Sequence, residues 1–149
     1  MSQIIYLNGQ YINRENAKIS IMDRGFLFGD GVYELIPVYN SKPFLINKHL
    51  KRLRSSLELV GMSADFQDIE NLEQIMLELI SKNQYVNHFF YVHITRGYQS
   101  SRNHVYSENI KHTVLVMGEE YKVFPKEKLG KGFKGCVRDD FRWMKSNIK

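Results

Sequence analysis

The chain has 149 residues, of which 43% are hydrophobic, 13% aromatic and 25% charged, as in a soluble globular domain rather than a disordered or fibrous protein. Its net charge of +5 comes from lysines and arginines spread along the sequence, so no nucleic-acid-binding surface is expected. One cysteine excludes an intrachain disulfide bond, and no apolar run approaches the ~20 residues that span a bilayer.

The N-terminus has neither a basic leader nor a long apolar run, so no signal peptide is predicted. We therefore expect a soluble, cytoplasmic protein that has no membrane partner. The one basic cluster contains Lys48, Lys51, Arg52 and Arg54, and its spacing alone favours the solvated face of a helix.

Several runs of β-branched and aromatic residues predict strands. They cover residues 3–7, 10–12, 32–39, 44–46, 88–95, 113–117 and 133–142. Asn8-Gly9 is typical of a two-residue hairpin turn, and residues 40–43 predict a second turn. Residues 23–31 hold three glycines and are expected to form neither a stable helix nor a regular strand, and residues 97–109 are predicted to form a polar loop.

Two amphipathic helices lie between these strands. The first has an apolar stripe with steps of three and four, made by Ile46, Leu50, Leu53, Leu57 and Val60. Asn47 is its predicted N-cap and Gly61 its C′ residue. The second covers residues 68–82, with Ile69, Leu72, Ile75, Met76, Leu79 and Ile80 facing inward. Because strands precede and follow two adjacent helices, we predict an α+β fold with a mainly antiparallel β-sheet.

Two segments resemble the class IV, pyridoxal-phosphate-dependent aminotransferases. They are residues 23–34, Asp-Arg-Gly-Phe-Leu-Phe-Gly-Asp-Gly-Val-Tyr-Glu, and residues 142–149, Arg-Trp-Met-Lys-Ser-Asn-Ile-Lys. In this resemblance Lys149 matches the catalytic lysine that carries the cofactor as a Schiff base. The lysine pattern alone does not favour Lys149 over Lys145.

A third segment, residues 47–53, is similar to the family's Asn-x-His-x-x-Arg-Leu helix. The resemblance implies that Arg52 binds the phosphate of pyridoxal 5'-phosphate. Arginine suits that role because it forms bidentate, charge-assisted hydrogen bonds with phosphate. From spacing alone, Arg52 would be interpreted as one more exposed arginine of the basic cluster.

Arg102 and His104 lie one residue apart in a polar loop, where both can direct donors at one carboxylate. This Arg-x-His pattern resembles the substrate-carboxylate site of D-amino-acid (D-alanine) transaminases, and Tyr33 matches the tyrosine that completes that site. His88 and His93 share a predicted strand at odd spacing, so they point to opposite faces and no metal site is expected.

The resemblance covers nearly the whole chain and corresponds to the family's N-terminal domain, without the C-terminal cofactor domain. It implies transamination between a D-amino acid and a 2-oxo acid by a homodimer, because in the family the Arg-x-His loop reaches the neighbouring subunit. We expect the 149-residue chain alone to be inactive. The alternatives are an aminodeoxychorismate lyase of the same fold and a truncated, non-catalytic domain.

Overall fold

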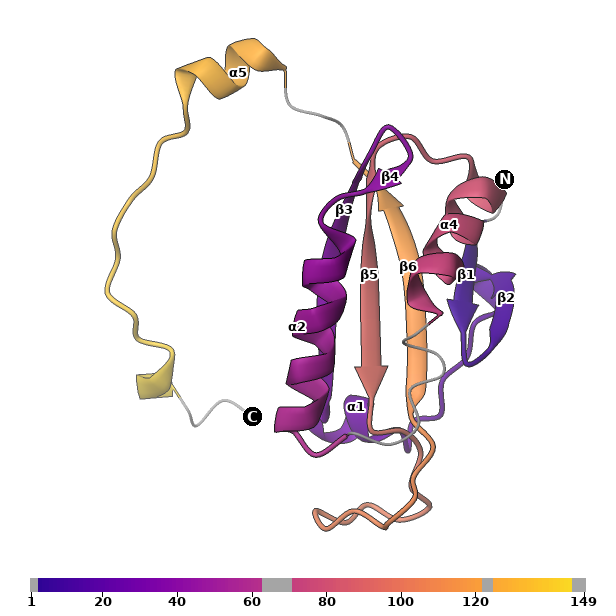
Figure 1. Cartoon of the computed structure of the whole chain (residues 1–149). Helices are drawn as coiled ribbons and strands as arrows, with labels where there is room; N and C mark the ends of the chain where they lie inside the picture. Colours follow the sequence, from indigo (N-terminus) through magenta and orange to yellow (C-terminus); the bar gives the residue numbers. More distant parts are fainter. Residues whose placement is uncertain (1–2, 63–70, 122–124, 146–149) are drawn as a thin grey trace.

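The computed structural model describes residues 3–62, 71–121 and 125–145, and its centre is a six-stranded antiparallel sheet in the order β2-β1-β6-β5-β3-β4 (Figure 1). The strands are β1 (Ile4–Leu7), β2 (Gln10–Asn13), β3 (Gly31–Tyr39), β4 (Lys42–Pro43), β5 (His88–Thr95) and β6 (Thr113–Glu120). The helices are α1 (Arg24–Phe28), α2 (Ile46–Leu59), α4 (Leu72–Asn83) and α5 (Lys126–Lys131), with 3₁₀ turns η1 (Arg14–Asn16) and η2 (Trp143–Lys145). The predicted α+β class is confirmed.

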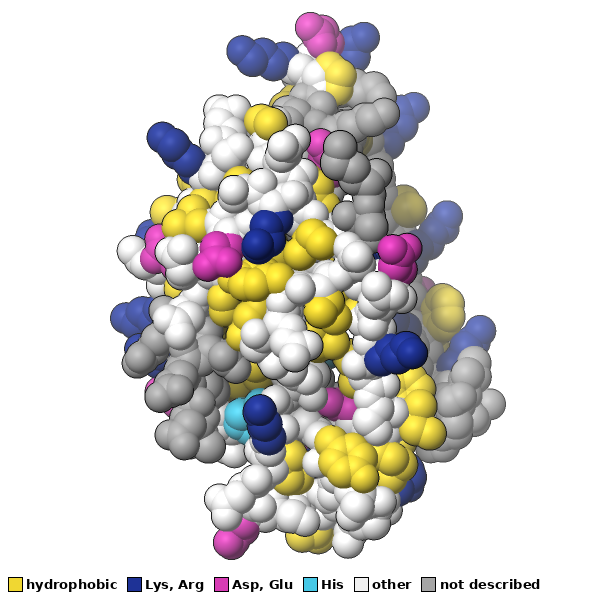
Figure 2. Space-filling model, turned by 90° about the vertical axis from the view of Figure 1, so that its right-hand side faces the viewer, with side chains coloured by type: hydrophobic (Ala, Val, Ile, Leu, Met, Phe, Trp, Pro, Cys, Tyr) yellow, Lys and Arg dark blue, Asp and Glu magenta, His cyan; other side chains and the backbone are white. Residues whose placement is uncertain are grey.

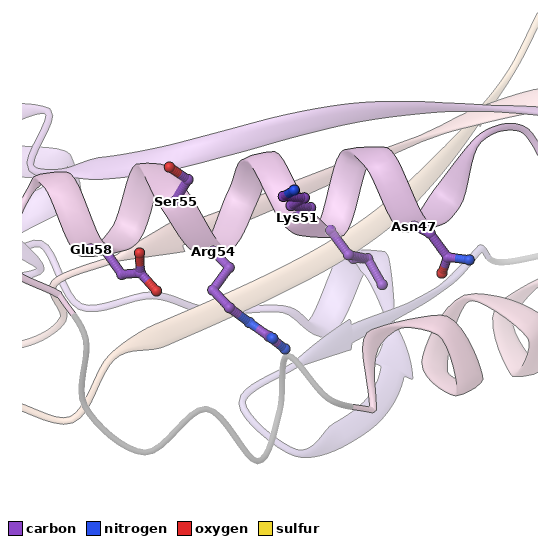
Figure 3. A pocket seen from close by; sticks show the side chains of 6 residues that line it. Asn47, Lys51, Arg54, Ser55 and Glu58 are labelled. Carbon is purple, nitrogen blue, oxygen red and sulfur yellow. The ribbon is translucent and has the colours of Figure 1, made fainter.

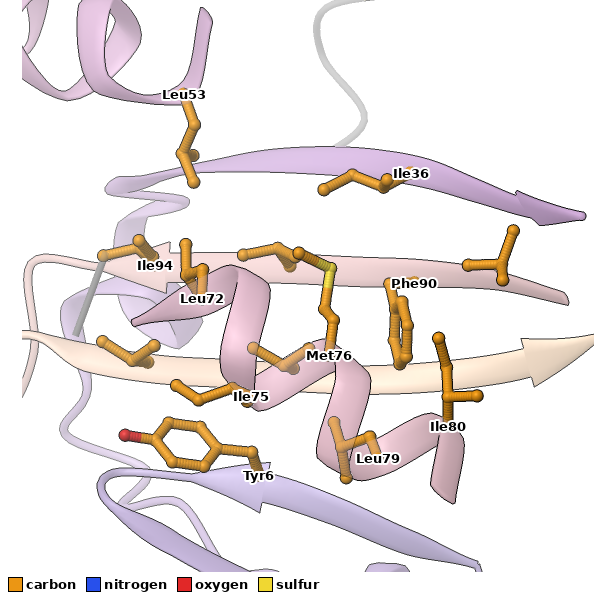
Figure 4. Close-up of a cluster of buried hydrophobic side chains, with 14 of the residues drawn as sticks. Tyr6, Ile36, Leu53, Leu72, Ile75, Met76, Leu79, Ile80, Phe90 and Ile94 are labelled. Carbon is orange, nitrogen blue, oxygen red and sulfur yellow. The ribbon is translucent and has the colours of Figure 1, made fainter. Parts of the chain in front are cut away.

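Helices α2 and α4 pack on one face of the sheet and close a single hydrophobic core (Figure 4). The predicted stripe of α2 contributes Leu53 and Leu57, which are fully buried. The other core residues are Tyr6, Ile36, Val38, Met62, Leu72, Ile75, Met76, Leu79, Ile80, Phe90, Val92, Ile94, Val114 and Val116. Along each strand these residues alternate, so one face of the sheet is buried. Each such side chain contributes about 1.5–3 kcal/mol on burial.

Three β3 residues that point away from this core are exposed. The exposed fraction is 66% for Tyr33 and 46% for both Leu35 and Tyr39. Figure 2 shows the β1–β2 side of the molecule, where basic side chains are dispersed among acidic and hydrophobic ones rather than gathered into one patch. None of the helices in the described ranges is long and apolar enough to cross a membrane.

The first predicted hairpin is confirmed, with Asn8 and Gly9 at positive φ between β1 and β2. The second hairpin turns earlier than expected, because Asn40 and Ser41 both adopt positive φ and form a two-residue turn. Its return strand is therefore β4, and the prediction of a strand over residues 44–46 is wrong.

The prediction that residues 23–31 form no helix is also wrong, because α1 occupies the middle of this segment. The side chain of Asp23 caps its start, and Gly29 ends it with φ of 66° in the left-handed region. Gly25 is required by packing, since a Cβ there would lie 2.3 Å from a side-chain carbon of Thr95. Tertiary contacts thus stabilise a five-residue helix that its glycine content disfavours.

The boundaries of the longer helices differ from the sequence prediction at their starts. The N-cap of α2 is Leu45 in the left-handed region, and not Asn47, so this turn has no side-chain cap. Gly61 follows the helix at positive φ, as predicted. The start of the second predicted helix, including Ile69, falls outside the described residues, and α4 is described from Leu72 onward.

The predicted strand over residues 133–142 is wrong. In the described residues after 125, the only regular elements are α5 and η2, and the segment between them runs apart from the sheet (Figure 1). Its apolar side chains are exposed, with 71% of Phe133 and 97% of Val137 accessible. Apolar and β-branched composition favours a strand, but without a neighbouring strand the backbone has no ladder to join.

His88 lies in the core face of β5, whereas His93 points to the other face, as their odd spacing predicted. The His88 ring is fully buried between the rings of Tyr85 and Phe90, at centroid distances of 4.8 Å and 4.7 Å. Neither of its nitrogens has a hydrogen-bond partner among the described residues. Burial lowers the pKa of His88 to about 4, so the ring is neutral at physiological pH.

Replacing His88 by Leu should flatten the pH dependence of the chain's stability. The unfolded state takes up a proton near the ordinary histidine pKa and the folded state only near 4, so stability is lost as pH falls through this window. Within this window, the free energy of unfolding falls by up to about 1.4 kcal/mol for each pH unit. Urea unfolding at pH 7 and pH 5 measures this loss in the parent chain and in His88→Leu. Equal losses in both proteins would contradict the assignment of this pH dependence to His88. His104→Gln, in an exposed loop, is the matched control.

Candidate functional site

A buried carboxylate on β3 holds two side chains of α2. Glu34 has an exposed side-chain fraction of only 2% and faces the helix. Arg52 donates to it from both Nε and Nη2, the latter 2.6 Å from Oε2, and Nδ1 of His49 lies 2.8 Å from the same oxygen. His49 and Arg52 are three residues apart and so share one face of the helix.

This cluster fixes the ionisation of Glu34. Burial raises the pKa of the carboxyl, but the hydrogen bonds from Arg52 and His49 outweigh burial and hold the pKa below its ordinary value. The carboxylate is therefore charged at neutral pH and restrains the guanidinium of Arg52. The side chain of Arg52 nevertheless keeps 67% of its surface exposed, so it can still meet a ligand.

A small pocket opens beside Arg52. It has a volume of about 220 Å³ and is lined by Leu45, Lys48, His49 and Arg52. Two cationic side chains at one pocket suit a phosphate group. A larger pocket of about 610 Å³ lies on another face of α2 (Figure 3), but its labelled side chains include none of the predicted site residues. We therefore place the candidate anion site at the smaller pocket.

Tyr33 lies on the opposite face of β3 from Glu34, because neighbouring strand residues point to opposite sides. Its ring centroid is 5.6 Å from that of Tyr91 on β5, and it pairs in register with His93. The pKa of Tyr91 is raised by burial and by the neighbouring Tyr33. Tyr33 and Arg52 are therefore presented on different faces of the sheet.

Arg102 and His104 are brought together by the loop between β5 and β6. Both side chains are exposed, and both lie against the ring of Phe28 at the end of α1. The guanidinium carbon of Arg102 is 5.0 Å from the ring centroid, and the ring of His104 is 5.1 Å from it. This cation–π and ring contact holds the pair at one place, whereas the ring of Tyr33 contacts Tyr91 instead.

Lys149, the predicted cofactor lysine, lies outside the described residues. The remaining predictions fall at three places: Arg52 beside its pocket, Tyr33 on the other face of β3, and the pair Arg102 and His104 on the loop. Within one copy of the chain, only Arg102 and His104 of these residues therefore lie together.

Sequence reasoning missed the charged residues that hold these groups, namely Glu34, Arg24, Asp30 and Arg96. All four are wholly or largely buried, with side-chain exposures of 2%, 5%, 17% and 7%. For Arg24, Asp30 and Glu34 the available signal was the concentration of charges among the glycines of residues 23–34, whereas Arg96 lies outside that segment and gave no such signal. Charged residues in a segment that cannot form a long amphipathic helix have no solvated face to occupy, and buried charges require partners.

Residues 31–149 match the model of the family described as amino-transferase class IV. The D-alanine aminotransferase of Staphylococcus epidermidis is 34% identical over 146 residues, which are 97% of this chain and 51% of that protein. The chain thus spans about half the length of the curated relatives it matches.

Solved structures also share the fold, as two examples show. The branched-chain amino acid aminotransferase of Escherichia coli has a TM-score of 0.73 and 21% identity, covering 81% of this chain and 42% of that one. The 4-amino-4-deoxychorismate lyase of Pseudomonas aeruginosa has a TM-score of 0.68 and 21% identity, covering 86% and 44%. The family model and the sequence relatives carry the assignment, and the chain belongs to the class IV aminotransferases.

Proposed function

We propose that the protein containing this chain is a pyridoxal-phosphate-dependent transaminase that moves an amino group from a D-amino acid to a 2-oxo acid. The observation that carries the proposal is that Arg102 and His104, on one loop, both lie against the ring of Phe28 on α1. A cation and an imidazole held together in this way can hydrogen-bond both oxygens of one carboxylate. The D-alanine aminotransferase relatives support this choice of substrate.

Arg52 fits the role of holding the cofactor phosphate. It lies at a pocket with Lys48, it is largely exposed, and Glu34 fixes its orientation. Glu34 engages two of the five N–H donors of the guanidinium, so donors remain for a phosphate. When bound, pyridoxal phosphate supplies the electron sink that stabilises negative charge at the substrate's Cα.

Lys149 completes the chemistry in this proposal. Once free as an amine, its Nζ would accept the proton from Cα of the amino acid and deliver it to carbon C4′ of the cofactor. A lysine can do so because its pKa falls readily on burial, which frees the amine. The resemblance implies that the C-terminal domain supplies the glutamate that faces the pyridine nitrogen. We therefore propose that the 149-residue chain is the N-terminal portion of the enzyme and is inactive alone.

The positions of Tyr33 and the loop support a site shared by two subunits. Within one chain Tyr33 contacts Tyr91, while Arg102 and His104 contact Phe28. A homodimer with two-fold symmetry, the commonest soluble assembly, can place the loop of one subunit near Tyr33 of the other. The carboxylate site would then contain residues from both chains.

Arg102→Ala in the complete protein should weaken substrate binding far more than cofactor binding. Loss of an arginine–carboxylate bond from a desolvated site costs about 2–5 kcal/mol, so the apparent KM for D-alanine should rise at least about thirtyfold. Steady-state kinetics with 2-oxoglutarate as acceptor, beside a pyridoxal phosphate titration, measure both quantities. An unchanged KM would show that Arg102 does not bind the carboxylate. Pyruvate release from aminodeoxychorismate without transamination would favour the lyase alternative.

Arg52→Lys should lower the affinity for pyridoxal phosphate and leave the fold intact. Lysine keeps a positive charge beside Glu34 but cannot form the bidentate bond with a phosphate. Arg52→Leu is the harsher variant, because it removes the main partner of a buried carboxylate. Equilibrium dialysis measures cofactor affinity, and circular dichroism reports the fold. Arg54→Lys on the same helix is the matched control, and an equal effect there would refute the assignment.

Mixing two impaired proteins, Tyr33→Phe and Arg102→Ala, tests the shared site. Each mixed dimer has one site with both defects and one with neither. After subunit exchange at equal concentrations, about a quarter of all sites should be intact. Transaminase activity of the mixture should exceed that of either variant alone. No gain, under conditions where labelled subunits are seen to exchange, would place the tyrosine and the loop in the same chain's site.

A further inference from the structure

The loop that carries Arg102 and His104 is tied to a buried ion cluster. One oxygen of Asp30, Oδ2, accepts hydrogen bonds from Nε of Arg24 and from Nε of Arg96, each at 2.8 Å. The side chains of the two arginines are 5% and 7% exposed. A single carboxylate thus fixes two guanidinium groups at the end of the sheet.

The remaining donors of the two arginines point to different parts of the chain. Arg24 donates from Nη1 to the carbonyl of Asn103 at 2.7 Å and from Nη2 to the carbonyl of His104 at 3.0 Å. Arg96 donates instead to the carbonyls of Val60 and Gly61 at the end of α2. Arg24 therefore holds the loop backbone at residues 103 and 104, whereas the guanidinium of Arg96 lies against the ring of Tyr106 further along the loop, 3.9 Å from its centroid.

A ring completes this attachment. The guanidinium carbon of Arg24 is 4.8 Å from the centroid of Phe28, and the same ring contacts Arg102 and His104. The backbone of the loop is thus held by Arg24, and two of its side chains are held by Phe28. Residues 100–109 are all exposed. Further contacts of the loop lie beyond residue 104, where the ring of Tyr106 packs on Arg96 and the side chain of Gln99 hydrogen-bonds the backbone of Val105 and Ser107.

We infer that Arg24 and Phe28 are positioning residues for the substrate carboxylate, acting by fixing the geometry of Arg102 and His104. This inference rests on the proposed function. Fixing the carbonyls of two successive residues fixes the peptide between them and so the direction in which the side chain of His104 leaves the backbone. A loop that is ordered before binding does not have to be ordered by the substrate, which improves affinity.

A purely structural role for the same residues makes a different prediction. If Arg24 and Phe28 only stabilise the fold, their replacement should lower stability, cofactor affinity and turnover together. If they position the loop, the loop should loosen and the KM for the amino acid should rise, with kcat and cofactor affinity unchanged. These outcomes separate the two roles.

Limited proteolysis tests the ordering of the loop without reference to activity. Trypsin cleaves after Arg102 in the loop and after Arg138 in the exposed segment beyond the sheet, which serves as internal standard. In the 149-residue chain, Arg24→Lys and Phe28→Leu should each raise the rate at Arg102 relative to Arg138 by at least about tenfold. The controls are Arg14→Lys, in an exposed ion pair, and Phe44→Leu, an exposed ring.

Unchanged cleavage at Arg102 in both variants overturns the inference. Should Arg24→Lys fail to fold, as judged by circular dichroism, Phe28→Leu decides alone, because it leaves all three members of the ion cluster in place.

Kinetics of the complete protein test the consequence for substrate. Arg24→Lys and Phe28→Leu should raise the apparent KM for D-alanine about tenfold without changing kcat or the dissociation constant of pyridoxal phosphate. If Arg102→Ala raises the KM and these two variants do not, the positioning role is overturned. If Arg102→Ala leaves the KM unchanged, the proposed carboxylate site has failed instead. Proteolysis then decides whether Arg24 and Phe28 order the loop.

Discussion

The arrangement of the site depends on one carboxylate, Asp30, shared by two buried arginines. Burial raises the pKa of Asp30, but the hydrogen bonds from Arg96 and Arg24 outweigh it and hold the pKa below its ordinary value. The carboxylate therefore stays charged at neutral pH and neutralises both guanidinium groups. A buried guanidinium without such a partner would strongly destabilise the fold. Through these arginines the end of α2 and the loop after β5 are joined at one end of the sheet.

Residues just before Asp30, at the start of α1, connect the strands at that end of the sheet. Asp23 is buried, and its two carboxylate oxygens accept hydrogen bonds from Thr95 at 2.7 Å and Thr113 at 2.6 Å, at the ends of β5 and β6. The same side chain caps α1, and Gly25 leaves room for Thr95. One short segment therefore caps a helix, joins two strands and presents Phe28 to the loop.

Sequence reasoning succeeded where a local pattern decides the element. The apolar stripe containing Leu53 and Leu57 predicted α2, and a run of aromatic and β-branched residues predicted the limits of β5. It failed at α1 and at residues 133–142, where contacts with distant residues, or their absence, decide the structure. At the site, the spacing of Arg102 and His104 predicted their proximity, whereas the pairing of Glu34 with α2 depends on how a helix docks on a strand.

The arginines of this chain separate by how many donors the protein itself has engaged. Arg24 is buried and directs four of its five N–H donors to protein oxygens, so at most one is left for a ligand. Arg52 is restrained by Glu34 yet largely exposed, and Arg102 makes a ring contact but no hydrogen bond within the described residues. A ligand must be bound by donors that are oriented but still free. Arg24 is therefore suited to positioning the loop, whereas Arg52 and Arg102 are suited to binding anionic groups.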